Sequence, residues 1–121
     1  MNDCPFCNLI ATGGYSARSD EFFAVHFEPL NPVTEGHRLV VPLAHVMDAL
    51  DNPYTTGNVM AYAAQVAAEM GLAPCNFITS VGAAATQSVY HLHIHIIPRH
   101  EDDGLALPWT GQQATGTGGA P

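Results

Sequence analysis

Basic side chains are scarce in this chain of 121 residues, which has no lysine and three arginines, Arg18, Arg38 and Arg99. The formal net charge is −8. A surface of that sign repels nucleic-acid polymers and anionic membranes, so we expect neither as a partner. A small phosphate ligand is still compatible with this composition, because backbone N–H groups, hydroxyls, amides and imidazoles can bind phosphate without lysine.

Cysteines and long apolar segments are scarce too. Cys4, Cys7 and Cys75 cannot all pair with one another, which argues against a disulfide scaffold. The N-terminus has neither the basic start nor the apolar core of a signal peptide, and no apolar run approaches the roughly 20 residues of a membrane span. We therefore predict a cytoplasmic protein whose thiols are mostly reduced.

The pattern of apolar residues predicts an α+β fold, with an antiparallel sheet of about five strands and one main helix. The helix is expected over residues 55–72, where an apolar stripe recurs at three- and four-residue spacing. Thr55 or Thr56 is its expected N-cap and Gly71 its expected C-cap. Strands are expected over residues 21–27, 36–42, 75–81 and 89–97.

The length suits a single small domain, which we place at residues 1–103. Residues 104–121 are rich in Gly, Thr, Ala and Pro and are predicted to form a largely disordered tail. Its apolar side chains are the ones that could fold back onto the domain, namely Leu105, Leu107 and Trp109.

Three histidines, His91, His93 and His95, alternate with Leu92, Ile94 and Ile96 in the last predicted strand. Side chains of a strand alternate between its faces, so the three imidazoles should share one face at intervals of about 7 Å. Such a straight row could be a chance feature of an exposed strand. Three histidines in a row cannot all converge on one metal ion at about 2.1 Å. A row of hydrogen-bond donors with one nucleophile along a phosphate fits this spacing best.

The run from His91 to Ile97 resembles the His-φ-His-φ-His-φ-φ signature (φ, apolar) of the histidine-triad (HIT) family, which are nucleotide hydrolases and transferases acting at the α-phosphate. Residues 31–45 and 87–90 are similar to segments of the same family, so the resemblance covers roughly residues 4–100. It implies a HIT-like fold and a small-molecule nucleotide substrate. It also implies a homodimer, with the helix and an edge strand at the interface.

By this resemblance His93 is the nucleophile, forming a nucleotidyl-histidine intermediate that water hydrolyses. The attacking nitrogen must be neutral, with the other ring nitrogen bonded to an acceptor that fixes the tautomer. His95 and His37 then donate to the phosphoryl oxygens, and one of them, as imidazolium, could protonate the leaving group.

The resemblance also assigns nucleotide-binding roles. Gln87 and Ser88 match positions that hydrogen-bond the phosphate. Two positions depart from the family pattern. Pro29 occupies the place of the Asp or Asn that binds the ribose hydroxyls, where Glu28 could substitute, and Ser80 replaces an Asn.

A Cys-x-x-Cys pair, Cys4 and Cys7, could be a redox pair, two idle thiols or half of a zinc site. A redox pair normally opens a helix after a strand, which this N-terminus does not resemble. Likeness to the bacterial Hint-like branch of the family implies a zinc site whose other ligands are His45 and His91. A Cys₂His₂ set is closed, so the zinc would be structural. His91 would then be either a scaffold for His93 or a participant in catalysis.

Two other functions remain open at this point. One is a nucleotide-binding module with negligible turnover, and the other is a small structural zinc protein. We expect His26, in the first predicted strand, to have a solvated structural role.

Overall fold

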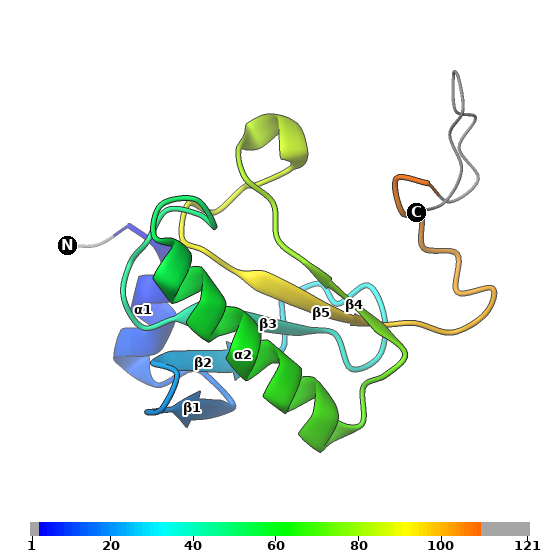
Figure 1. Cartoon of the computed structure of the whole chain (residues 1–121), viewed down its shortest axis with the longest axis horizontal. Helices are drawn as coiled ribbons and strands as arrows, with labels where there is room; N and C mark the ends of the chain where they lie inside the picture. Colours follow the sequence, from blue (N-terminus) through cyan, green and yellow to red (C-terminus); the bar gives the residue numbers. More distant parts are fainter. Residues whose placement is uncertain (1–2, 110–121) are drawn as a thin grey trace.

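The computed structural model describes residues 3–109, so residues 110–121 of the predicted tail lie outside the described part. The chain forms an α+β fold with one long helix, as predicted (Figure 1). The elements in chain order are α1 (Pro5–Thr12), β1 (Ala17–Ser19), β2 (Ala24–Phe27), β3 (Arg38–Pro42), α2 (Pro53–Met70), β4 (Cys75–Ile78), the 3₁₀ turn η1 (Ala83–Ala85) and β5 (Ile94–Pro98). Within residues 3–109, no helix has both the length and the apolar character needed to cross a membrane.

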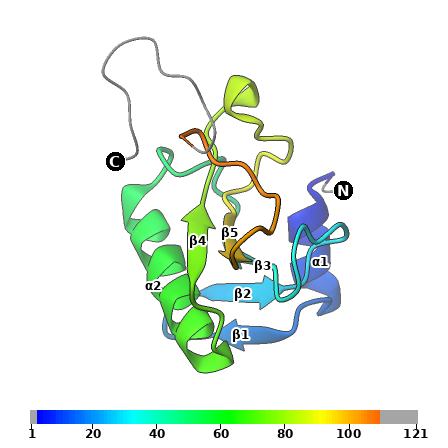
Figure 2. The same ribbon diagram turned by 90° about the vertical axis from the view of Figure 1, so that its right-hand side faces the viewer.

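The five strands form one antiparallel sheet in the order β1-β2-β3-β5-β4. Alternation of side chains along the strands divides the core into two layers. One face packs beneath α2, through residues such as Val40, Ile94 and Val66. The other face packs against α1, which lies across it (Figure 2). Because both faces are covered, the strands have apolar residues on both sides.

Helix α2 begins two residues before the predicted start. Asn52 is its N-cap, with the side-chain Oδ1 accepting a hydrogen bond from the Thr55 N–H at 3.2 Å. Pro53 follows at the first helical position, where a missing N–H costs nothing. The prediction that Thr55 or Thr56 caps the helix was therefore wrong. The prediction for Gly71 is confirmed, because this residue ends the helix in the left-handed conformation with φ of 65°.

The histidine segment is less regular than predicted, because β5 begins only at Ile94. The chain before it lies beside the loop that follows β3, where the Leu92 N–H donates to the carbonyl of Val46 at 2.8 Å. Alternation of the side chains nevertheless continues through this segment, and Leu92 is fully buried with Ile94 in the layer beneath α2. Strand β1, which has no apolar alternation, was not predicted.

Candidate active site and metal-binding cluster

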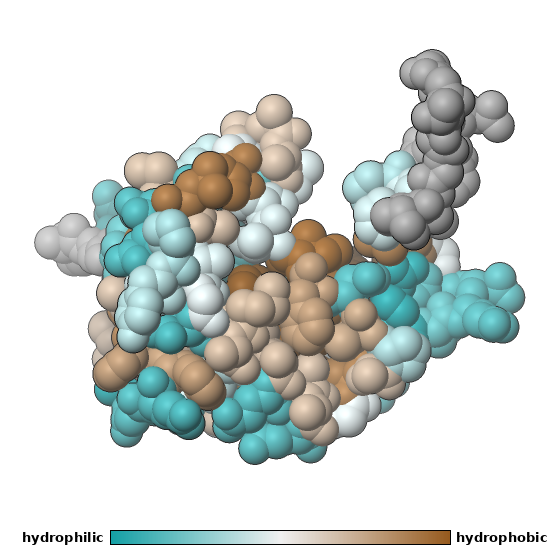
Figure 3. All heavy atoms as spheres, viewed as in Figure 1, coloured by the Kyte–Doolittle hydropathy of each residue, from teal (hydrophilic) through white to brown (hydrophobic). Residues whose placement is uncertain are grey.

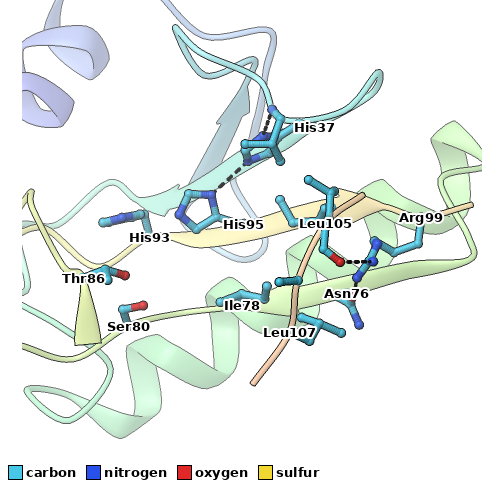
Figure 4. A pocket seen from close by; sticks show the side chains of 13 residues that line it. His37, Asn76, Ile78, Ser80, Thr86, His93, His95, Arg99, Leu105 and Leu107 are labelled. Carbon is cyan, nitrogen blue, oxygen red and sulfur yellow. Dashed lines mark hydrogen bonds between the residues drawn. The ribbon is translucent and has the colours of Figure 1, made fainter. Parts of the chain in front are cut away.

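A cavity of about 300 Å³ opens beside β5 on the face opposite α2. Figure 4 shows His37, His95 and His93 along one side, with Ser80 and Thr86 across from His93 and Leu105 and Leu107 toward the far end. A second, adjoining cavity of about 700 Å³ shares the three histidines and extends toward α1. The side chains lining this second cavity are mostly apolar, among them Phe6, Leu9, Phe27 and Leu30.

The tautomer of His93 follows from its hydrogen bond. Its Nδ1 lies 2.8 Å from the carbonyl oxygen of His91. A carbonyl can only accept, so Nδ1 carries the proton, and in the neutral ring Nε2 keeps its lone pair. A neutral imidazole with one nitrogen bonded to an acceptor is the form that a nucleophilic histidine requires.

His37 and His95 are joined in a chain of donors that starts at the backbone. The Val33 N–H donates to His37 Nδ1 at 3.1 Å, so the proton of neutral His37 must be on Nε2. His37 Nε2 lies 2.9 Å from His95 Nδ1 and donates to it. The remaining nitrogen of His95, Nε2, therefore carries a proton. This N–H is available to a phosphoryl oxygen, because His95 lines both cavities.

Burial keeps these two rings neutral. It lowers the pKa of His95 to about 4, and the neighbouring His93 and His37 contribute in the same direction. Burial also lowers the pKa of His37, against the opposing effect of Glu28. In the free protein both rings therefore act as neutral N–H donors near pH 7, and not as imidazolium acids.

Gly36 explains why a glycine precedes His37. Its φ is +86°, a conformation that other residues rarely adopt, and a Cβ there would lie 3.2 Å from Pro98 Cγ. The glycine therefore allows the chain to enter β3 close to the end of β5. This close approach brings His37 within hydrogen-bonding distance of His95.

Four side chains are positioned to bind a metal ion: Cys4, Cys7, His45 and His91. Their ligand atoms all lie within 4.8 Å of one another. His91 Nδ1 lies 3.4 Å from Cys4 Sγ and 3.5 Å from Cys7 Sγ, and His45 Nδ1 lies 3.2 Å from Cys7 Sγ. A tetrahedral ion with bonds of about 2.3 Å to sulfur and about 2.1 Å to nitrogen separates sulfur from nitrogen by about 3.6 Å. The cluster therefore fits such an ion.

Local structure places these ligands. Cys4 is the N-cap of α1 and Cys7 lies in its first turn, with the Cys7 N–H 3.4 Å from Cys4 Sγ, so both thiols face the same side. His91 is fully buried, and its Nε2 donates to the carbonyl of Pro42 at 2.9 Å, which leaves Nδ1 as the ligand nitrogen. Burial lowers the pKa of His91, which favours the neutral ring that a metal requires.

Three of the four predicted nucleotide-binding residues line one of the two cavities, and the fourth does not. Ser80 lines the smaller cavity, while Glu28, Pro29 and Ser88 line the larger one. The structure does not bring Gln87 to either cavity.

The Gln87 amide is instead bonded to the backbone. Its Oε1 accepts from the Gly82 N–H at 2.8 Å, and its Nε2 donates to the carbonyls of Met47 and Val89 at 2.9 and 3.1 Å. Both amide hydrogens are thus committed. In this conformation Gln87 stabilises the turn before His91, and its predicted bond to phosphate has no donor left.

Several residues at the site were not predicted. Thr86 lines both cavities, in the left-handed conformation after η1. Arg99 lines the smaller cavity and binds both carboxylate oxygens of Asp103 through one guanidinium edge, with Nε donating at 2.7 Å and Nη2 at 3.0 Å. Arg99 Nη2 also donates to the carbonyl of Leu105 at 3.0 Å. Leu105 and Leu107, two of the apolar residues expected to be able to fold back onto the domain, line the cavity.

The prediction for His26 was wrong, because this residue is only 8% exposed. The Tyr62 ring of α2 packs near it, with ring centroids 5.9 Å apart. The alternation of side chains in the strand correctly predicted that His26 lies on the face opposite Val25 and Phe27. It did not predict that α2 covers this face.

Comparison with known proteins supports one family. The HIT domain matches residues 18–102 of this chain. The chain is 33% identical over 114 residues to the adenosine 5'-monophosphoramidase of Saccharomyces cerevisiae, covering 91% of this chain and 72% of that protein. It is 30% identical over 111 residues to the adenylylsulfatase of Arabidopsis thaliana, covering 87% of this chain and 56% of that protein.

Solved structures agree with this result. A histidine triad protein from Clostridium difficile superposes with a TM-score of 0.72 at 29% identity, covering 84% of this chain and 94% of that one. The α+β fold, the row of histidines and the sequence matches all lead to one conclusion: this chain belongs to the HIT family.

Proposed function

We propose that this protein is a nucleotide hydrolase or transferase that acts at the α-phosphate through His93. The observation that supports this most directly is the bond from His93 Nδ1–H to the carbonyl of His91, because it leaves a lone pair on Nε2. His93 lines both cavities, so that lone pair can reach a bound phosphate.

In the proposed first step, the Nε2 lone pair of His93 attacks the α-phosphorus. A nitrogen–phosphorus bond forms, and the bond to the leaving group breaks, with its electron pair departing on that group, which takes up a proton from solvent when it is an amine. The ring becomes a phosphoryl-imidazolium, whose positive charge the His91 carbonyl stabilises. The N–H of His95 donates to a phosphoryl oxygen. Water then attacks the phosphorus, and the nitrogen–phosphorus bond breaks with its electron pair returning to His93 Nε2. The nucleoside monophosphate and one proton are released.

The proposed substrates are nucleoside phosphoramidates and dinucleoside polyphosphates. The two named relatives are an adenosine 5'-monophosphoramidase and an adenylylsulfatase, and both names describe cleavage next to an adenylate phosphorus. The apolar lining of the larger cavity suits a nucleoside, while the smaller cavity could accept the leaving group. Ser80, in place of the family's Asn, and Glu28, the neighbour of Pro29, are the proposed nucleotide contacts.

We propose Zn²⁺ as the ion of the four-residue cluster. Two thiolates and two imidazoles form the donor set that zinc prefers, and all four tetrahedral positions are occupied by protein. Bound there, the ion would stabilise the fold and leave no position for a reacting water. His91 would then act as a scaffold, with its ring on the metal and its carbonyl on His93.

We also propose a homodimer formed through α2 and β4. Strand β4 lies at an edge of the sheet, so one side of its backbone is available for pairing. Apolar residues gather over α2 and β4 on the face seen in Figure 3. The exposed large apolar side chains of these two elements include Met60, Met70 and Phe77. Light scattering after size-exclusion chromatography would test this: a monomer at micromolar concentration would contradict it. The cytoplasmic location stays a prediction.

Mass spectrometry tests the central proposal. Incubation with a slow adenylate substrate should add one AMP to the intact protein, on a peptide containing His93, and the adduct should be absent in His93→Gly. A binding module would show no adduct, and its nucleotide affinity would not change in His93→Ala. A purely structural zinc protein would show neither adduct nor nucleotide binding.

A further inference from the structure

A separate cavity of about 360 Å³ lies between β1 and the C-terminal half of α2. Figure 2 shows these two elements side by side at the edge of the sheet. The cavity shares no lining residue with the two cavities at His93. His26 and Tyr62 line it from the interior, and Asp20, Glu21 and Glu69 line it from the surface.

Behind His26 lies a buried positive charge. Arg38 is only 8% exposed. Its Nε donates to His26 Nδ1 at 3.2 Å, and its Nη2 lies 3.0 Å from the same nitrogen. Nη2 also donates to Ser16 Oγ. The ion pairs found within residues 3–109 join Arg18 to Asp20 and Arg99 to Asp103, so no carboxylate there pairs with Arg38. A buried guanidinium without a carboxylate is costly unless an acceptor approaches it.

The bond from Arg38 determines the tautomer of His26. A guanidinium can only donate, so Nδ1 accepts and Nε2 carries the proton. Donation by a cation to one edge of the ring polarises the N–H on the other edge and makes it a stronger donor. This Nε2–H has no hydrogen-bond partner within residues 3–109. Every side-chain nitrogen in that range that is fully shielded from solvent does have a hydrogen-bond partner, so His26 Nε2 is not fully shielded. It is therefore accessible, and the cavity that His26 lines is where it can be reached.

The mouth of the same cavity has the opposite charge. Asp20, Glu21 and Glu69 are exposed carboxylates, and Arg18 neutralises only one of them through its 2.8 Å contact with Asp20. The site thus offers a positively polarised donor at the floor and negative charge at the rim. A metal ion does not fit the floor, because the protonated Nε2 of His26 has no lone pair to give.

We propose that this cavity is a second small-molecule site that takes an amino-carboxylate zwitterion. Its carboxylate would accept from the His26 N–H, and its ammonium group would lie among Glu21, Glu69 and Asp20. A single ligand would then complement both the N–H donor at the floor of the cavity and the carboxylates at its rim.

Nuclear magnetic resonance of the full-length, ¹⁵N-labelled protein can test this site. The probes are glycine, β-alanine, γ-aminobutyrate and 5-aminopentanoate, which vary the distance between the two charges. Butyrate, butylamine and Ca²⁺ are control probes that carry charge of one sign only. We expect one zwitterion to saturate with a Kd of about 1–10 mM, to shift the His26 ring N–H, and to bind about tenfold more tightly than butyrate or butylamine.

Variants decide between a site and a charged surface. Glu69→Gln should weaken zwitterion binding about fivefold without changing nucleotide hydrolysis, whereas Glu101→Gln, the same charge change at an exposed residue outside the cavity, should leave binding unchanged. His26→Phe should abolish binding, and Glu69→Gln remains informative if that variant is unstable. The proposal is overturned if no zwitterion saturates, if butylamine or Ca²⁺ binds as tightly, or if Glu69→Gln binds like the unaltered protein.

Discussion

His91 and His93 are two residues apart on the same side of the chain, yet they use opposite nitrogens. His91 donates from Nε2 to the Pro42 carbonyl and directs Nδ1 to the thiols. His93 donates from Nδ1 to the His91 carbonyl and keeps Nε2 for the cavity. The backbone carbonyl that each ring meets therefore selects its tautomer, and the tautomer decides whether the ring suits a closed metal cluster or an open reaction site.

Removal of the His93 ring is the strongest test of this comparison. His93→Gly should lower kcat/KM by about 10⁴-fold or more, because among the three histidines that line the cavity only His93 keeps an uncommitted lone pair. Free imidazole should restore part of the activity by occupying the vacated space. Equal activity of the variant and the unaltered protein would eliminate the proposed role of His93.

Loss of the metal cluster should have the next largest effect. Cys4→Ser should lose the bound metal and lower the free energy of unfolding by about 3 kcal/mol or more, since the cluster joins α1 to His91. Turnover should fall as well, because the His91 carbonyl that orients His93 would be less well fixed. Metal content by plasma mass spectrometry and denaturant unfolding measure both effects.

Cys75→Ser provides the control for that experiment, because Cys75 lies on β4 outside the cluster. It should keep its metal content and its activity. Full metal content in Cys4→Ser would instead contradict the proposed ligand set.

Acid should destabilise the protein through His95. Its folded pKa of about 4 lies below the ordinary value of 6.5, so between these pH values the unfolded chain binds a proton that the folded chain does not. The free energy of unfolding should therefore decrease as pH falls from 6.5 to 4. The contribution from His95 should be at most about 3 kcal/mol, because the ring is partly exposed and solvent screens it.

Unfolding by urea at several pH values, compared between the unaltered protein and His95→Gln, isolates this contribution. The lowered pKa values of His26, His37 and His91 act in the same direction and remain in the variant. Identical pH dependence in the two proteins would show that His95 titrates normally.

The smallest expected effect separates Gln87 from Ser80. Gln87→Ala should lower the free energy of unfolding by about 1–2 kcal/mol, because it removes three bonds to the backbone, while KM changes little. Ser80→Ala should show the reverse, with a raised KM and nearly unchanged stability, since Ser80 lines the cavity. Steady-state kinetics and thermal unfolding of both variants would reveal a phosphate role for Gln87 as a raised KM.

Much of the fold could be predicted because local patterns encode it. The alternation of Leu92, Ile94 and Ile96 with histidines identified both the buried side and the reactive side of the segment. The apolar stripe of α2 and Gly71 at its end likewise agree with the structure. Strand β1 was missed because Ala17 and Arg18 are exposed and the strand has no apolar alternation, so that it is recognised by its pairing with β2.

The candidate site could be predicted in its residue types but not in its hydrogen bonds. An amide such as Gln87 can bind phosphate or a turn equally well, and only the positions of Gly82 and Met47 favour the turn. The burial of His26 depends on Tyr62, which lies 36 residues away along the chain. Such contacts between distant residues have no local periodicity from which to predict them.

The sequence by itself determined the fold class and the shared face of the histidines, because alternation and spacing are local properties of the chain. The metal ligands beyond the Cys-x-x-Cys pair were expected from the resemblance to the HIT family, and the structure brings all four together. Tertiary structure alone decided the tautomers of His91 and His26, because the Pro42 carbonyl and the Arg38 guanidinium that fix them lie 49 and 12 residues away along the chain. The tautomers of His93 and His37 depend on nearer partners, the His91 carbonyl and the Val33 N–H, which lie two and four residues away.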